Sequence, residues 1–204
     1  CIIWTVGCTN TILKRMYDYM GHKIPANIAG AMLCAILSDT VIFKSPTCTE
    51  EDKKVAAELA AIAGVEDIEA LGMELFTAKS AVAGVPMRDL IFRDFKDFSM
   101  NGAKVGVGQL ELISLDLVKD IKEELKAELA AVKGEEGRHT AMLLLTDIMK
   151  EGSELLLVSD DCNRILAGFG MDPGCLDMNE MIWMPGVMSR KKQVVPALEA
   201  AFRG

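Results

Sequence analysis

A run of three cations near the C-terminus is the segment with the clearest capacity for binding chemistry. Arg190, Lys191 and Lys192 follow a glycine-containing turn and precede an apolar helical run, so we expect them at the start of a helix. Cations at this end of a helix oppose its dipole and repel one another, which costs stability. An anion held by the N–H groups and the basic side chains would offset that cost, with arginine gripping a phosphoryl group through two bonds. The residues alone leave a solvated basic surface as the alternative.

Asp39 is the next candidate, between Ser38 and Thr40 at the end of an apolar helical run. A carboxylate there is expensive to bury without a partner. It could cap nearby N–H groups, or it could bind a hard divalent cation such as Mn²⁺ or Mg²⁺.

Lys96 alternates with phenylalanines on a predicted strand, between Asp94 and Asp97. Taken alone, this pattern predicts a surface lysine in local ion pairs. A further turn, Gly7 to Thr11, joins an apolar segment to a helix, and either an anion or simple capping by Thr9 would explain it.

Other common site types find no support in the sequence. His22 and His139 lie in no metal-binding spacing, and neither a Gly-x-Ser-x-Gly turn nor a phosphate-binding P-loop is present. The six cysteines are scattered without a Cys-x-x-Cys pair, which predicts free thiols in a reducing cytoplasm.

Composition narrows the class of protein further. Half of the 204 residues are apolar, enough for a buried core, and the net charge of −8 argues against nonspecific binding to nucleic acid or anionic membranes. The longest apolar runs, such as 28–37, are too short to span a bilayer. Because a β-branched strand begins at Cys1 without any preceding segment, we expect the native chain to extend upstream.

These candidate residues must be positioned by interleaved helices and strands, which predicts an α/β fold whose second lobe has a mixed sheet. Asn101-Gly102 predicts a tight hairpin turn, and the lobe boundary should lie between residues 70 and 95. The predicted strands are 1–6, 94–99, 103–113, 141–148, 155–159 and 180–184. The first predicted helix follows the turn at residues 7–11 and ends near residue 20, and the others are 26–36, 49–63, 115–132, 160–169 and 191–202.

Six segments resemble one family in the same order. They are Gly7–Thr11, Ile36–Thr40, Lys44–Thr49, Asp94–Phe98, Gly106–Gln109 and Ser189–Pro196. Over essentially its whole length, the chain resembles the C-terminal portion of the family II (manganese-dependent) inorganic pyrophosphatases of the DHH phosphoesterase superfamily.

The resemblance implies an architecture and an activity. Residues 1–75 would be the end of a DHH-type α/β catalytic domain, 76–93 a linker, and 94–204 a smaller, DHH-associated substrate-binding domain of α/β type. The intact protein would hydrolyse pyrophosphate to two phosphates at a dinuclear Mn²⁺ or Co²⁺ centre, with Mg²⁺ as a further candidate metal. It would be cytoplasmic, bind neither nucleic acid nor membrane, and could form a homodimer.

The resemblance also assigns roles to residues. Asp39 would be a metal ligand, and the substrate phosphates would be bound by Lys96, Ser189, Arg190, Lys191 and Gln193. The family's His-x-x-x-x-Asp-x-Asp and Asp-His-His motifs are absent from these 204 residues. We therefore expect an incomplete metal centre and no activity in this chain alone.

Two other functions remain open. The parent protein could be another DHH-type phosphoesterase acting on short oligonucleotides or cyclic dinucleotides. Alternatively, the chain could be a non-catalytic, phosphate-binding regulatory module.

Overall fold

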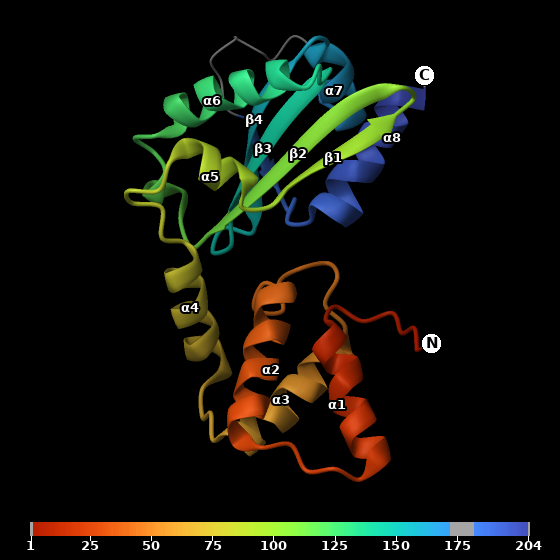
Figure 1. Ribbon diagram of the computed structural model, residues 1–204, viewed down its shortest axis with the longest axis vertical. Coiled ribbons are helices and arrows are strands. Elements are labelled where there is room, and N and C mark those ends of the chain that lie inside the picture. Colours follow the sequence, from red (N-terminus) through yellow and green to blue (C-terminus); the bar gives the residue numbers. More distant parts are fainter. Residues whose placement is uncertain (1, 172–181, 204) are drawn as a thin grey trace. The chain divides into compact units, whose positions relative to one another are not determined.

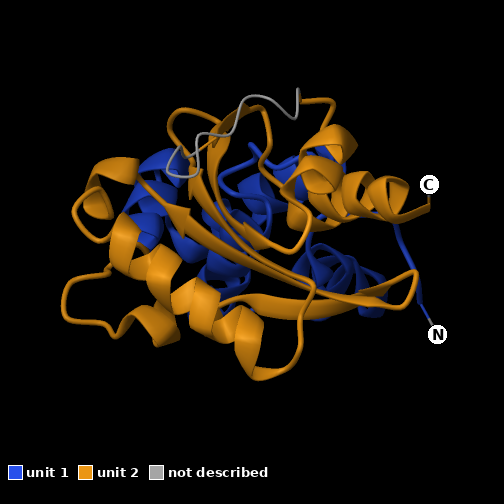
Figure 2. Ribbon diagram, turned by 90° about the horizontal axis from the view of Figure 1, so that it is seen from above, with its two compact units in different colours: residues 1–79 blue, residues 80–204 orange. Residues whose placement is uncertain are grey.

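The computed structural model describes residues 2–171 and 182–203 and divides the chain into two compact units (Figures 1 and 2). Unit 1 is Cys1–Lys79 and unit 2 is Ser80–Gly204. The assignment of residues 1–75, 76–93 and 94–204 to two named domains and a linker stays a prediction. Within the described residues, no helix is both long and apolar enough to cross a membrane.

Unit 1 is built from helices. Its central helix is α2, which was predicted to lie in the core because it is apolar almost all round, and Leu33, Ile36 and Leu37 are indeed fully buried. Helix α2 continues to Asp39, three residues beyond its predicted end. The four helices are α1 (Thr9–Met20), α2 (Ala26–Asp39), α3 (Glu50–Ala63) and α4 (Ile68–Lys79).

The strand predicted at residues 1–6 is wrong, since residues 2–6 form no regular element. A strand requires a hydrogen-bonded neighbour, and the described elements of unit 1 are all helical. The apolar side chains of Ile2 and Trp4 instead line a surface hollow together with Ile12 and Met16 of α1.

Unit 2 contains a five-stranded sheet with the order β1-β2-β3-β4-β5. Strands β2 and β3 are parallel and the other neighbours are antiparallel, so the predicted mixed sheet is confirmed. Asn101 and Gly102 have φ angles of 48° and 82°, the left-handed backbone of a two-residue hairpin. The strands are β1 (Phe95–Met100), β2 (Ala103–Leu112), β3 (Thr140–Asp147), β4 (Gly152–Ser159) and β5 (Ile182–Pro185).

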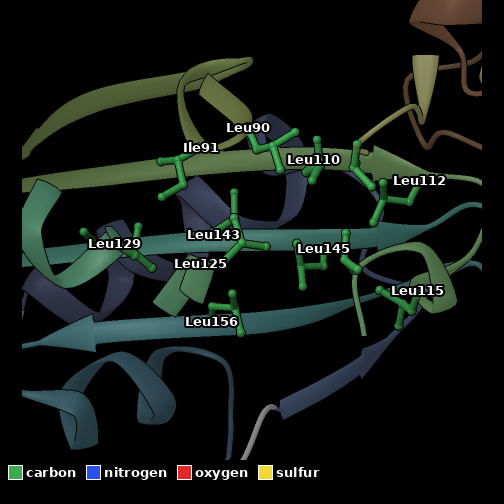
Figure 3. Packing of buried hydrophobic residues seen from close by; sticks show 13 residues of the cluster. Leu90, Ile91, Leu110, Leu112, Leu115, Leu125, Leu129, Leu143, Leu145 and Leu156 are labelled. Carbon is green, nitrogen blue, oxygen red and sulfur yellow. The ribbon is translucent and has the colours of Figure 1, made fainter. Parts of the chain in front are cut away.

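Helices cover both faces of this sheet (Figure 1). Helices α5 (Met87–Phe92) and α6 (Lys122–Glu135) pack on one face, and α7 (Cys162–Gly168) and α8 (Val195–Arg203) pack on the other. Strand β3 is buried along its entire length, as expected for a strand covered on both sides. Figure 3 shows the core on the α5–α6 face, where leucines from the helices meet leucines from β2, β3 and β4.

The helix predicted at 115–132 is interrupted. A short 3₁₀ helix, η1 (Leu115–Leu117), precedes α6, which begins only at Lys122. The N–H of Leu115 donates to the buried carboxylate of Asp147 at 3.2 Å, which ties η1 to the end of β3. The apolar spacing continues across the break because Leu115 and Leu125 enter the same core.

The C-terminal helix predicted at 191–202 begins as a wider π-helical turn, η3 (Arg190–Val194), before α8. In this turn the N–H of Val194 donates to the carbonyl of Ser189, five residues earlier, at 3.3 Å. Pro196 follows and has no N–H with which to continue the regular ladder. Glu180 and Met181 of the predicted last strand lie outside the described residues, as do Cys1 and Cys175.

We predict that Gly108→Ala destabilises the protein by roughly 1–3 kcal/mol, because a side chain here would overpack the core. A Cβ at position 108 would lie 2.9 Å from Leu143 Cδ1 and 3.1 Å from Phe95 Cδ2. Urea denaturation followed by circular dichroism measures this change.

The matched control is Gly134→Ala in α6, where a Cβ would meet nothing within 4 Å. Removing a helical glycine there should stabilise the protein by about 0.5–1 kcal/mol. Equal effects of the two substitutions would contradict the close packing inferred around Gly108.

Candidate anion-binding site

Arg190 is the most firmly held cation of the basic run. Its Nη1 donates to the carbonyls of Asp94 at 2.7 Å and Val107 at 3.1 Å, and its Nη2 donates to Asp94 Oδ1 at 2.8 Å. The side chain is only 9% exposed. The guanidinium is therefore fixed against the start of β1 and the neighbouring strand β2.

Gln193 and Ser189 hold the basic turn in shape. Gln193 Oε1 accepts the N–H groups of Met188 and Ser189, both at 2.9 Å, while its Nε2 donates to the carbonyl of Gly186 at 2.8 Å. Ser189 Oγ caps the turn by accepting the N–H of Lys192 at 3.3 Å. Both side chains were predicted to bind phosphate, and the structure places them in bonds within their own segment.

These bonds correct one expectation about the helix start. An anion was expected to bind N–H groups there, but those of Met188, Ser189 and Lys192 already have side-chain acceptors. The N–H of Arg190 likewise donates to Gln109 Oε1 at 3.3 Å. With these four N–H groups occupied, the basic side chains are the main groups through which this segment could contact an anion.

A buried polar network fastens the segment to the sheet, and the sequence reasoning missed it. Gln109 Nε2 donates to Thr146 Oγ1 at 3.0 Å and to the carbonyl of Met188 at 3.1 Å. Thr146 Oγ1 lies 2.8 Å from Ser153 Oγ, which donates to the carbonyl of Val187 at 2.6 Å. The sequence contained a signal for this network, because Gln109, Thr146 and Ser153 are polar residues at inward positions of the apolar strands β2, β3 and β4.

Lys96 lies on the same face of the sheet as this network. Its register partner is Val107, whose side chain belongs to the core beneath α8. Within the described part of the chain, Lys96 does not form the predicted ion pairs, because Asp94 binds Arg190 and Asp97 binds Arg138 at 2.7 Å instead. Among the residues that the structure describes, the side chain of Lys96 has no hydrogen-bond or ion-pair partner, while its main chain pairs with Val107 in the sheet.

Lys191 is the second cation in this condition. Its side chain is exposed, and it too has no hydrogen bond or ion pair with any described residue. The structure therefore brings Lys96, Lys191 and Arg190 to one region of unit 2, where α8 begins over the edge of the sheet. Two exposed ammonium groups beside a fixed guanidinium can bind a small, highly charged anion through charge-assisted hydrogen bonds.

Asp39 belongs to unit 1, as the last residue of α2, and it is exposed. The buried thiol of Cys8 lies against it. Burial, together with the hydrogen bond to Asp39, raises the pKa of the Cys8 thiol to about 11. Across residues 2–171 and 182–203, no group of three or more His, Cys, Asp or Glu side chains could hold a metal ion. The donor side chains of the described residues therefore do not by themselves fit a dinuclear manganese centre.

Asp52 joins the motif segments of unit 1. Its carboxylate accepts the N–H of Gly7 at 2.8 Å, the hydroxyl of Thr11 at 2.5 Å, and both the N–H and the hydroxyl of Thr49 at 2.8 and 2.6 Å. The predicted capping box of Thr49 and Asp52 is confirmed. A Cβ on Gly7 would lie 2.9 Å from Thr40 Cγ2, which shows how tightly these segments pack.

The hydrogen bonds to Asp52 bear on the two roles that were considered for the turn before α1, namely binding an anion and helix capping by Thr9. The N–H of Gly7 is directed at the protein's own carboxylate, so an external anion is not needed there. Capping by Thr9 was also wrong, since the N-cap is Cys8, whose sulfur accepts the N–H of Asn10 at 3.4 Å.

A strained turn follows Asp39 directly. Val41, Ile42 and Phe43 have φ angles of 51°, 50° and 63°, a conformation that costs roughly 1–2 kcal/mol per non-glycine residue. Hydrogen bonds from the N–H of Ile42 to the carbonyl of Leu37, and from that of Ser45 to that of Thr40, both 2.9 Å, hold the turn closed. Such strain persists only where the surroundings over-determine it and is concentrated at functional sites.

Comparison with known proteins identifies the family. The sequence profile of the DHHA2 domain matches residues 73–201, which is more than half of the chain. The chain belongs to the DHHA2 domain family. The DHHA2 match includes Lys96 and the whole of the basic turn.

The relatives of this DHHA2 chain extend the match to unit 1. It is 50% identical over 197 residues to a probable manganese-dependent inorganic pyrophosphatase of Archaeoglobus fulgidus, covering 97% of this chain and 60% of the relative. It is 43% identical over 207 residues to the manganese-dependent inorganic pyrophosphatase of Methanocaldococcus jannaschii, covering 98% of this chain and 66% of the relative. A Methanococcus jannaschii crystal structure described as a family II inorganic pyrophosphatase matches with a TM-score of 0.86 and 42% identity, covering 98% of this chain and 66% of that one.

The predicted resemblance to family II inorganic pyrophosphatases is thereby confirmed, as is the α/β fold class. The DHHA2 chain spans between 60 and 66% of the length of these relatives.

We predict that Asp52→Asn destabilises unit 1 by about 2–3 kcal/mol, because an amide N–H₂ would face buried donors. Burial tends to raise the pKa of the Asp52 carboxyl, but the hydrogen bonds from Thr11, Thr49 and Gly7 outweigh it and lower the pKa. A lowered pKa stabilises the fold above the unfolded value of about 3.9, and this stability is lost as the pH falls through the folded value. The difference between wild type and variant should therefore shrink in acid.

Urea denaturation at neutral pH and below about pH 4 tests this dependence. The control is Asp67→Asn, since Asp67 accepts the N–H of Ala70 at 2.9 Å in an exposed position where asparagine serves equally well. Equal losses in the two variants, or a loss independent of pH, would disprove the role given to Asp52.

Proposed function

We propose that this chain is the substrate-binding portion of an inorganic pyrophosphatase, and that Lys96, Lys191 and Arg190 bind pyrophosphate or phosphate. The observation that carries the proposal is the pair of exposed, unpartnered ammonium groups beside a guanidinium anchored at 2.7 and 3.1 Å to main-chain carbonyls. The acidic neighbours of Lys96 bind arginines instead. The ammonium groups of Lys96 and Lys191 therefore remain available to a ligand. The names of the relatives, which are inorganic pyrophosphatases, support pyrophosphate as the anion.

The three cations have different parts in this proposal. Lysine carries a compact charge on a flexible stem, whereas arginine presents a rigid, planar fork. Lys96 and Lys191 supply mobile charges that can follow the phosphoryl oxygens. Arg190 supplies a fixed reference point, and Ser189 and Gln193 contribute by holding the turn that carries Lys191.

Hydrolysis requires more than this chain contains. The relatives are named as manganese-dependent enzymes, and we propose Mn²⁺ as the metal of the intact protein, with Co²⁺ and Mg²⁺ as alternatives. Asp39 is the proposed ligand from this chain. The remaining ligands would come from the His-x-x-x-x-Asp-x-Asp and Asp-His-His motifs, which these 204 residues lack. Free thiols at Cys8, Cys34, Cys48 and Cys162 fit a cytoplasmic protein.

This chain alone should consequently bind pyrophosphate without hydrolysing it. A phosphate-release assay with Mn²⁺ measures this directly, with an intact family member as the positive control. Sustained, Mn²⁺-dependent phosphate release by the 204-residue chain would overturn the proposed division of the active site.

We predict that Lys191→Ala weakens pyrophosphate binding tenfold or more, because a charge-assisted contact contributes about 1.5–3 kcal/mol. Isothermal titration calorimetry with inorganic pyrophosphate measures the loss. Since Lys191 has no partner among the described residues, the substitution should leave the stability of the protein unchanged.

The control for this substitution is Lys119→Ala. Lys119 is exposed and, within the described part of the chain, likewise unpartnered, so its removal changes the net charge equally. A dinucleotide titrated in parallel separates pyrophosphate from the substrates of other DHH-type enzymes. Equal binding by both variants would show that Lys191 does not contact the ligand.

A further inference from the structure

We propose that Asp94 is an internal competitor for the anion at Arg190, so that a phosphoryl oxygen must displace its carboxylate to reach the fork. This inference rests on the proposed function, because it concerns the affinity of the same site. Asp94 would thereby limit binding to anions whose charge is high enough to displace its carboxylate from Arg190.

The bonds of Arg190 fall into a permanent and a replaceable set. Nη1 donates to two main-chain carbonyls, those of Asp94 and Val107, which no side-chain motion can withdraw. Only the bond from Nη2 to Asp94 Oδ1, at 2.8 Å, depends on a side chain. If that carboxylate leaves, the guanidinium keeps its place and gains a vacant donor.

The Asp94 side chain is suited to leave. Its main chain is fixed, since the carbonyl accepts both Arg190 Nη1 and the N–H of Gln109, the latter at 3.0 Å. Its carboxylate, by contrast, is 50% exposed while the Arg190 side chain is 9% exposed. Within the described residues, that carboxylate accepts a hydrogen bond from no group other than Arg190. Rotation about its side-chain bonds would place it in water.

Charge decides the exchange. An exposed carboxylate carries one negative charge, whereas pyrophosphate carries several and is attracted by Lys96 and Lys191 as well. A singly charged anion would replace one charge-assisted bond with another of similar strength and gain little. A polyanion gains contacts with both ammonium groups, so the competitor favours pyrophosphate over chloride or acetate.

Asp94→Asn tests this idea, because the amide oxygen can still accept Nη2 but no longer carries charge. Calorimetry with inorganic pyrophosphate on the 204-residue chain should show binding about five- to tenfold tighter than wild type, since the amide oxygen can keep the hydrogen bond from Nη2 but loses the attraction between two opposite full charges. The control is Asp89→Asn, an exposed residue of α5 that makes no ion pair with any described residue. It changes the net charge equally and should alter the affinity by less than twofold.

Lys191→Ala in the same series keeps the two proposals distinguishable. If wild type binds, Lys191→Ala weakens binding and Asp94→Asn is unchanged or weaker, the competitor is disproved while the binding site stands. If Asp94→Asn binds pyrophosphate and wild type does not, the result supports the proposal that the Asp94 carboxylate competes with the anion for Arg190. If neither protein binds pyrophosphate, both proposals fall. Should Asp94→Asn lose its circular dichroism spectrum, Asp94→Ser serves as the second variant, with the same expected gain.

Discussion

The side-chain amide of Gln109 is the contact on which the candidate site in unit 2 depends. It reaches from the centre of β2 to two points of the basic segment, the carbonyl of Met188 and the N–H of Arg190, across about eighty residues of sequence. A buried amide that is fully bonded fixes a geometry, because leaving any of its groups unpaired costs about 1–3 kcal/mol. The orientation of the turn that carries Lys191 follows from this one side chain and its neighbours Thr146 and Ser153.

The same principle operates in unit 1 with a carboxylate. Asp52 gathers the N–H of Gly7 and the side chains of Thr11 and Thr49, and thereby brings three separate motif segments together. In both units, side chains of the protein accept several of the helix-start N–H groups that were expected to bind an anion. Several motif residues of this chain thus hold neighbouring segments in place.

The sequence predicted those features that are set locally. The Asn101-Gly102 turn, the capping box at Thr49 and the mixed sheet depend on dihedral preferences and alternation within short windows. The partners of Arg190 could not be predicted, because Asp94 and Val107 lie over eighty residues away and meet it only through the sheet.

The errors have equally physical causes. Residues 1–6 have the composition of a strand, but composition cannot supply a neighbouring strand to pair with. The π-helical start of the last helix reflects Pro196 and the bonds of Gln193, which spacing alone does not reveal. For the candidate site, the sequence was enough to select the basic residues. It could not show that the Lys191 side chain is exposed to a ligand whereas the Gln193 side chain supports the turn.

Side-chain acceptors already occupy the main-chain N–H groups of Met188, Ser189, Arg190 and Lys192, and this has a consequence for selectivity. A cage of backbone donors imposes the shape of its ligand, as a phosphate-binding loop does. Ammonium groups on long, flexible stems respond to charge density and tolerate different arrangements of oxygens. If this surface binds pyrophosphate as proposed, it would accept an extended diphosphate or a compact monophosphate without rearranging its backbone. Its grip is also screened by dissolved salt over about 10 Å at moderate ionic strength.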